Sequence, residues 1–217
     1  VGLLVGKAAG TINEVYTEGT LEGNSHSFTG TYTITPIYRV GGIIGTNNNT
    51  GALIFNNSQS KANIKGIGTS SDVTSSAPIS IRIGGLIGNT NRISTNTLTL
   101  TNNTFEGNIS LRNYLHNNVS QNVAGIIGYS EGTTNITFSA LINSEVNLNN
   151  LGHLDLDGTG NNLVNAAGGI ISNNSFAPAT FRNIMNYGTF TRTNYSNFKY
   201  TTLLLNLSTN GITLHNS

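Results

Sequence analysis

One short segment of this 217-residue chain carries residue types suited to holding a metal ion. It reads His153-Leu154-Asp155-Leu156-Asp157-Gly158-Thr159-Gly160-Asn161. The Asp-x-Asp-Gly turn followed by Gly-Asn offers hard oxygen ligands on a turning backbone, which is the chemistry that Ca²⁺ prefers. Asp155, Asp157 and Asn161 therefore form a candidate Ca²⁺ loop. The alternative is a solvated turn at the end of a short alternating strand, because the bidentate Glu and the rest of an EF-hand loop are missing.

The other residues that could do chemistry are dispersed. Four histidines lie in separate parts of the chain, without the regular spacing of metal ligands, at His26, His116, His153 and His215. A polysaccharide-cleaving β-helix gathers several carboxylates on one face of adjoining coils. The nine acids of this chain are sparse, and most lack an acidic counterpart one repeat away. We name no catalytic residue and predict that the chain is not an enzyme, with a carbohydrate-active enzyme as an alternative.

Aromatic side chains supply a hint of binding. They fall in the variable parts of the sequence, at Tyr32, Tyr38, Tyr114, Tyr195, Phe198 and Tyr200. Such rings could line a groove that stacks on sugar rings or on peptide. Packing in the core, or cover for an open end of the molecule, is the alternative interpretation.

Asparagine occurs in nine Asn-x-Ser/Thr sequons. The candidate acceptors are Asn48, Asn56, Asn102, Asn108, Asn118, Asn135, Asn173, Asn194 and Asn206. A chain this rich in Asn, Ser and Thr contains about eight sequons by chance, so their number alone does not indicate glycosylation.

Three runs place threonine at every second residue, at 31–35, 95–101 and 189–193. A flat, ranked threonine face would resemble an ice-binding solenoid, whereas β-propensity alone also favours outward threonine in strands. The runs occupy different positions within their repeats. We therefore predict that they do not line up into one array.

All of these residues must be positioned by a chain that repeats itself. A glycine-aliphatic box, as in Val40-Gly41-Gly42-Ile43-Ile44-Gly45, occurs five times, at residues 1–6, 40–45, 83–88, 123–128 and 167–172. A second apolar stretch follows each box, at residues 12–21, 55–64, 100–109, 138–148 and 181–190. Units too small to bury their own apolar face must stack on their neighbours, which predicts a solenoid.

The predicted units lie near residues 1–39, 40–82, 83–122, 123–165 and 166–202, with a partial sixth at 203–217. No linker interrupts them, so residues 1–217 are predicted to form a single domain. Because the chain begins inside a box and stops partway through a unit, we expect it to be a segment of a larger protein.

Composition predicts the kind of solenoid. Only 9% of residues are charged, and short β-branched or aromatic segments alternate with Gly and Asn, as strands and turns do. We predict an all-β fold, a right-handed parallel β-helix of five to six coils with variable loops. Box aliphatics would point inward, and box glycines would allow close backbone approach. Asn at turns would adopt left-handed geometry and form amide ladders between coils.

The boxes Gly41-Gly42-Ile43-Ile44-Gly45 and Gly84-Gly85-Leu86-Ile87-Gly88, each followed by a strand and a Gly-x-apolar segment, resemble GLUG-type repeats. They resemble more loosely the repeats of polymorphic outer-membrane proteins. The first box departs from the pattern at Leu3, and the fifth closes with Ser172 in place of glycine. The resemblance implies an extracellular adhesin or passenger region at a cell surface.

Charge and composition limit the partners. Ten Lys and Arg against nine Asp and Glu leave a formal charge of +1, so nucleic acid is not predicted as a partner. No apolar segment approaches the roughly 20 residues that a membrane span needs, and no cysteine is present. We expect a non-catalytic surface or filament protein that binds a glycan or protein ligand, or associates with itself end to end. No cofactor beyond the candidate Ca²⁺ is predicted.

Overall fold

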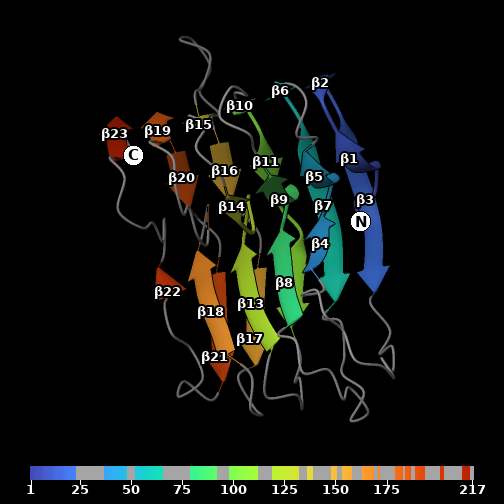
Figure 1. Cartoon of the computed structure of the whole chain (residues 1–217), viewed down its shortest axis with the longest axis vertical. Helices are drawn as coiled ribbons and strands as arrows, with labels where there is room; N and C mark the ends of the chain where they lie inside the picture. The colour runs from blue at the N-terminus through green and yellow to red at the C-terminus, as the bar shows by residue number, and fades with distance from the viewer. Residues whose placement is uncertain are drawn as a thin grey trace.

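The computed structural model shows an all-β molecule built from parallel strands (Figure 1). The structure describes residues 1–22, 37–47, 52–65, 79–91, 98–111, 119–131, 136–138, 148–150, 153–157, 163–168, 171, 179–182, 184–186, 189–193, 201–202 and 212–215. Every strand pair in these segments is parallel, and no helix occurs within them. The predictions of an all-β fold and of parallel strands are therefore confirmed.

The strands form four sheets. The four-stranded sheet contains β1 (Val5–Ala8), β5 (Ile44–Asn47), β9 (Ile87–Asn91) and β14 (Ser130–Glu131). The five-stranded sheet contains β4 (Ile37–Gly41), β8 (Ile79–Gly84), β13 (Val119–Ala124), β18 (Leu163–Gly168) and β22 (Thr201–Thr202). The six-stranded sheet contains β2 (Gly10–Asn13), β6 (Leu53–Asn56), β10 (Leu98–Thr101), β15 (Ile136–Phe138), β19 (Ala179–Arg182) and β23 (Ile212–His215). The eight-stranded sheet contains β3 (Tyr16–Glu22), β7 (Gln59–Lys65), β11 (Thr104–Phe105), β12 (Asn108–Leu111), β16 (Leu148–Asn150), β17 (His153–Asp157), β20 (Ile184–Asn186) and β21 (Thr189–Thr193).

Neighbouring strands in each sheet come from successive repeats, so each sheet collects the same part of every unit. One aliphatic position of the box shows this over five repeats, through the paired residues Val5, Ile44, Ile87, Ile127 and Ile171. The four isoleucines are fully buried. Each such side chain contributes about 1.5–3 kcal/mol by transfer from water. The predicted alignment of box aliphatics is confirmed at this position.

The second apolar stretch also stacks, with one correction. Its first residue forms a column of six paired residues: Ile12, Phe55, Leu100, Phe138, Phe181 and Leu214. Its last residue forms a column of Leu21, Ile64, Ile109, Leu154 and Phe190. The prediction that the fourth copy ends at Leu148 is wrong. Leu154 pairs with Ile109, whereas Leu148 pairs with Ile184 in the short strand β20.

Except for Gly6, the box glycines whose surroundings are described lie where neighbouring backbones approach too closely for a side chain. A Cβ atom on Gly42 would come closer than 3.0 Å to the Gly85 carbonyl oxygen and to Ser60 Oγ. On Gly85 it would meet the Gly125 carbonyl oxygen and the Phe105 ring within the same limit. Steric exclusion, not turn geometry, therefore requires glycine here. The prediction of close approach is confirmed.

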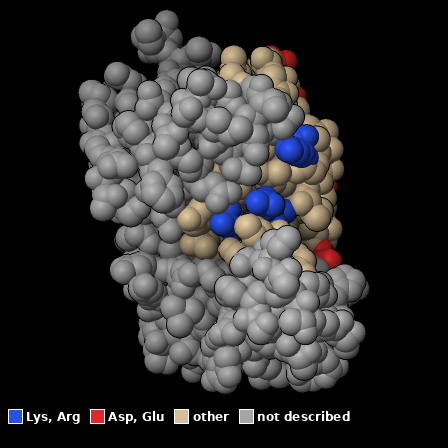
Figure 2. All heavy atoms as spheres, in the orientation of Figure 1, with Lys and Arg blue, Asp and Glu red and all other residues tan. Residues whose placement is uncertain are grey.

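The described surface carries few charges in the orientation of Figure 1, with a small number of Lys and Arg side chains among uncharged residues (Figure 2). One arginine is buried: Arg82 of β8 lies 4.0 Å from the centroid of the Tyr129 ring and donates to Asn89 Oδ1 at 2.8 Å. This cation–π and hydrogen-bond pair holds the charge in place. In the described segments, no helix has the length and hydropathy to cross a membrane.

Candidate binding face

The predicted Ca²⁺ ligands are only partly placed. Asp155 and Asp157 lie in β17, two residues apart in one strand. Asp155 pairs with Ser110 on one side and Thr191 on the other, and Asp157 pairs with Thr193. Asn161 lies outside the described residues. Among the residues that the structure describes, no three His, Cys, Asp or Glu side chains gather as a metal site, so the Ca²⁺ loop stays a prediction.

Among the candidate aromatic residues, Tyr38 is described. It lies in β4, is half-buried and packs against the hydrophobic core. Tyr38 therefore takes part in packing in addition to any contact with a ligand. The others fall outside the described part of the chain: Tyr32, Tyr114, Tyr195, Phe198 and Tyr200.

Three sequon asparagines are described, and they differ in accessibility. Asn108 is exposed at the start of β12, whereas Asn56 and Asn102 are half-buried at turns. Asn108 is therefore the most accessible of the three. The other acceptors lie outside the described residues: Asn48, Asn118, Asn135, Asn173, Asn194 and Asn206. Glycosylation remains a prediction.

Asparagine forms the predicted ladder at the turn between the six- and eight-stranded sheets. Asn57 Nδ2 donates to Asn13 Oδ1, and Asn102 Nδ2 donates to Asn57 Oδ1, each at 3.1 Å. Asn57 and Asn102 have φ angles of 50° and 55°. Asn tolerates this left-handed region better than most residues. The equivalent residue of the first repeat is Glu14, with φ 55°, and a glutamate has no such tolerance.

A buried polar column lies beside this ladder and joins the two sheets. Asn103 is fully buried; its Oδ1 accepts from the Ser58 backbone N–H at 3.1 Å, and its Nδ2 donates to the Phe55 carbonyl at 2.7 Å. In the previous repeat, Ser58 Oγ accepts from the Val15 N–H at 3.1 Å. Each side chain thus satisfies a backbone group of the preceding coil, which offsets the desolvation of buried polar groups.

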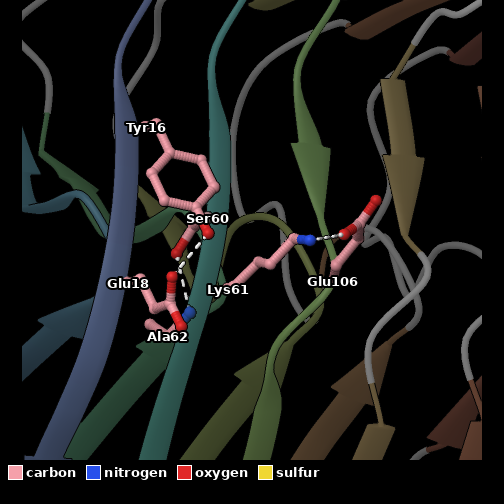
Figure 3. Close-up of polar contacts among 6 residues, drawn as sticks. All are labelled: Tyr16, Glu18, Ser60, Lys61, Ala62 and Glu106. Atoms are coloured by element: carbon pink, nitrogen blue, oxygen red, sulfur yellow. Dashed lines mark hydrogen bonds and ion pairs between the residues drawn. The ribbon is translucent and has the colours of Figure 1, made fainter.

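The outer side of the eight-stranded sheet carries rows of charged and amide groups that run from coil to coil. Glu18 pairs in register with Lys61, and Lys61 Nζ lies 3.1 Å from Glu106 Oε2 (Figure 3). Two residues further along, Asn108 Nδ2 donates to Asn63 Oδ1 at 2.9 Å. We call Tyr16, Glu18, Lys61, Asn63, Glu106 and Asn108 the polar face.

Tyr16 provides an aromatic surface at one side of the polar face. It is 53% exposed, and its hydroxyl donates to Glu18 Oε2 at 2.7 Å (Figure 3). This hydrogen bond raises the pKa of the Tyr16 phenol. The hydrogen bond and charge of Glu106 likewise raise the pKa of Lys61. Both residues therefore keep their protons at neutral pH.

The polar face has the groups that recognise sugars or polar peptide surfaces: an exposed ring, carboxylates, an ammonium and amides. Its charges alternate in sign along the row, from Glu18 through Lys61 to Glu106, which leaves one carboxylate in excess. The positions of the acids alone do not reveal this face, because the partner of Glu18 one repeat away is a lysine and not an acid. The spacing of 43 residues from Glu18 to Lys61, the same as from Ile12 to Phe55, was the signal that could have revealed it.

Comparisons with protein-family models, with curated proteins and with solved structures found no match for this chain.

Proposed function

We propose that the chain is a right-handed parallel β-helix from an extracellular surface or filament protein, and that it presents a repetitive, non-catalytic surface for adhesion or assembly. The observation that carries the proposal is the pairing of equivalent residues from successive repeats in four sheets. Right-handed coiling follows from the strong preference of parallel crossover connections for that hand. The likeness of the boxes to GLUG-type repeats supports a location at a cell surface.

The polar face is the surface proposed for adhesion. Stacked coils place its side chains about 4.8 Å apart along one direction, as neighbouring strands are. An extended ligand would meet an acid, a base and an acid at successive coils, at Glu18, Lys61 and Glu106. The Tyr16 ring, 53% exposed, offers a stacking surface at one side. A glycan chain or an extended protein segment fits this description.

Binding measurements on the intact chain test the proposal. The purified protein is incubated with immobilised neutral and acidic polysaccharides and with immobilised glycoproteins, and the bound fraction is measured. We expect retention on at least one support, and weaker retention for the Tyr16→Ala, Asn108→Ala double variant. Lys7→Ala serves as the control, because Lys7 is exposed on the four-stranded sheet, away from the polar face.

Electron microscopy of the same preparation tests assembly. Ordered filaments support a structural role, and retention without filaments supports adhesion. The proposal is overturned if the chain neither binds nor assembles, or if it releases soluble sugar from any polysaccharide. The second result would assign the chain to the carbohydrate-active enzymes.

A further inference from the structure

The six-stranded sheet carries a column of threonines that lies across its strands, with one residue from each strand. The threonine runs within single strands do not reveal it. Pairing places one residue from each of six repeats side by side: Thr11, Ile54, Thr99, Thr137, Thr180 and Thr213. Five of the six are threonine. The six strands follow one another without interruption across the sheet (Figure 1). We call these six positions the threonine column.

Composition does not account for this column. Threonine makes up 29 of the 217 residues, so a fixed position in six repeats would hold about one threonine from composition alone. The preference of strands for threonine raises this number but does not select one position. The predicted mismatch is confirmed for two of the threonine runs, because Thr99 lies in the six-stranded sheet and Thr191 in the eight-stranded sheet. The run at 31–35 lies outside the described residues. The column uses one threonine per repeat instead.

The described side chains of the column, Thr11, Ile54 and Thr99, lie on the outer side of the sheet. Their neighbours along the strands, Phe55 and Leu100 among them, are fully buried in the core, and side chains alternate between faces in a strand. Thr11 is exposed, Ile54 is 38% exposed and Thr99 is half-buried. Where the structure describes these side chains, the column therefore reaches solvent.

The geometry of the column is regular and its chemistry is uniform. Strand pairing spaces the residues by about 4.8 Å in one line. A β-branched side chain has few χ1 rotamers, so each threonine offers a hydroxyl and a methyl group in a restricted orientation. Ile54 keeps the branched methyl group and carries an ethyl group in place of the hydroxyl. All six positions are uncharged.

We propose that the threonine column is an ice-binding surface. Its spacing is close to the repeat of water oxygens along one axis of hexagonal ice, so hydroxyl and methyl groups could hold water in a lattice that matches a growing crystal. A charged column would orient its own hydration shell away from that lattice, and this column has no charge. The inference is independent of the proposed adhesion, which uses the eight-stranded sheet.

Thermal hysteresis and partitioning into a slowly growing ice hemisphere test the inference with the intact chain. We expect the wild-type protein to enter the ice and to show hysteresis, and Thr99→Lys to lose both. The matched control is Thr46→Lys, because Thr46 is also half-buried but lies in the four-stranded sheet. Ile54→Thr completes the column and should raise hysteresis at equal protein concentration.

Exclusion of the wild-type protein from ice, to the same degree as a globular protein without ice affinity, overturns the inference. So does equal loss for Thr99→Lys and Thr46→Lys when circular dichroism shows that both variants are folded. If Thr99→Lys does not fold, a rise for Ile54→Thr supports the inference, and no rise overturns it. The ice measurements do not test the binding of polysaccharides by the polar face, which is measured separately.

Discussion

The six-stranded and eight-stranded sheets share a hydrophobic core and the same stacking, yet their outer sides differ in chemistry. The six-stranded sheet presents an uncharged column of threonines, and the eight-stranded sheet presents alternating acids, lysines and amides. Both patterns repeat once per coil. Strand pairing therefore fixes only the spacing of surface groups, and each outward position can carry its own recognition chemistry.

Truncating a core phenylalanine should have the largest effect on the free energy of unfolding. It also tests whether the two sheets unfold cooperatively. Phe55 lies under the six-stranded sheet and Phe105 under the eight-stranded sheet, both fully buried in one cluster. We expect Phe55→Ala and Phe105→Ala each to lower the free energy of unfolding by about 3–5 kcal/mol. Denaturant unfolding measures this, with Phe55→Leu as the milder control.

The two phenylalanine variants should also lose stability in one transition, seen equally by far- and near-ultraviolet circular dichroism. Two separate transitions, each affected by one variant, would mean that the sheets are independent units.

Removing the polar link between the two sheets should have the next largest effect. Asn103→Ala leaves the Ser58 N–H and the Phe55 carbonyl without their side-chain partner. We expect a loss of about 2–4 kcal/mol in the free energy of unfolding, because both buried groups lose a hydrogen bond. Asn103→Ser is the matched control, since Ser58 occupies the equivalent place one repeat earlier.

Serine at position 103 can accept from the Ser58 N–H as Ser58 accepts from Val15. It should therefore restore part of the stability that Asn103→Ala loses. Equal losses for the two variants would show that a serine hydroxyl cannot replace the Asn103 amide oxygen at this corner.

Glu14 allows a smaller, stabilising test of the amide ladder. It occupies the left-handed position that Asn57 and Asn102 hold in the next repeats. We expect Glu14→Asn to raise the free energy of unfolding by about 1 kcal/mol, because asparagine tolerates this backbone geometry. Glu14→Gln keeps the strain and should leave stability unchanged. A gain for Gln as large as that for Asn would assign the effect to charge.

The smallest expected effect is the pH dependence of the polar face. Glu106 raises the pKa of Lys61 above its ordinary value of 10.5. A raised lysine pKa adds stability that is complete below the ordinary value and is lost as pH rises through the folded-state value. The wild-type protein should therefore be slightly more stable to unfolding than Lys61→Met, and it should lose this difference in the free energy of unfolding only above about pH 10.5.

Added salt should reduce the difference in unfolding free energy between the wild-type protein and Lys61→Met at neutral pH, because the Lys61–Glu106 pair is partly exposed. Unfolding curves of both proteins at several pH values and salt concentrations measure it. An advantage that persists above that pH range would exclude the ion pair as its cause. The threonine column has no charged residue, so Thr99→Val should show no comparable pH or salt dependence.

The box residues were predictable because sterics leave little choice at their positions. Gly42 and Gly85 meet neighbouring backbones that exclude a Cβ atom, so the glycines recur and reveal the stacking of Ile44 on Ile87. The end of the fourth copy was not predictable in this way. The length of chain between Phe138 and Leu154 is set by the connection, and no pairing rule restricts it.

The two outer faces were missed for a different reason. The patterns used for prediction were threonines within one strand and acids aligned with acids. The groups that we propose for recognition instead lie across strands, one per coil, as Thr99 and Thr137 do. Seeing them requires the strand register, which the apolar positions Ile12, Phe55 and Leu100 already define.

The pairing of β13 with β18 has a consequence for how such a chain can change. Between Gln121 and Asn122 the register shifts, because β18 contains one additional residue, and pairing resumes with Asn122 opposite Ala166. The extra residue is accommodated locally, and β18 still pairs with β22. Neighbouring strands can therefore differ in length by one residue without losing the register of the strands that follow.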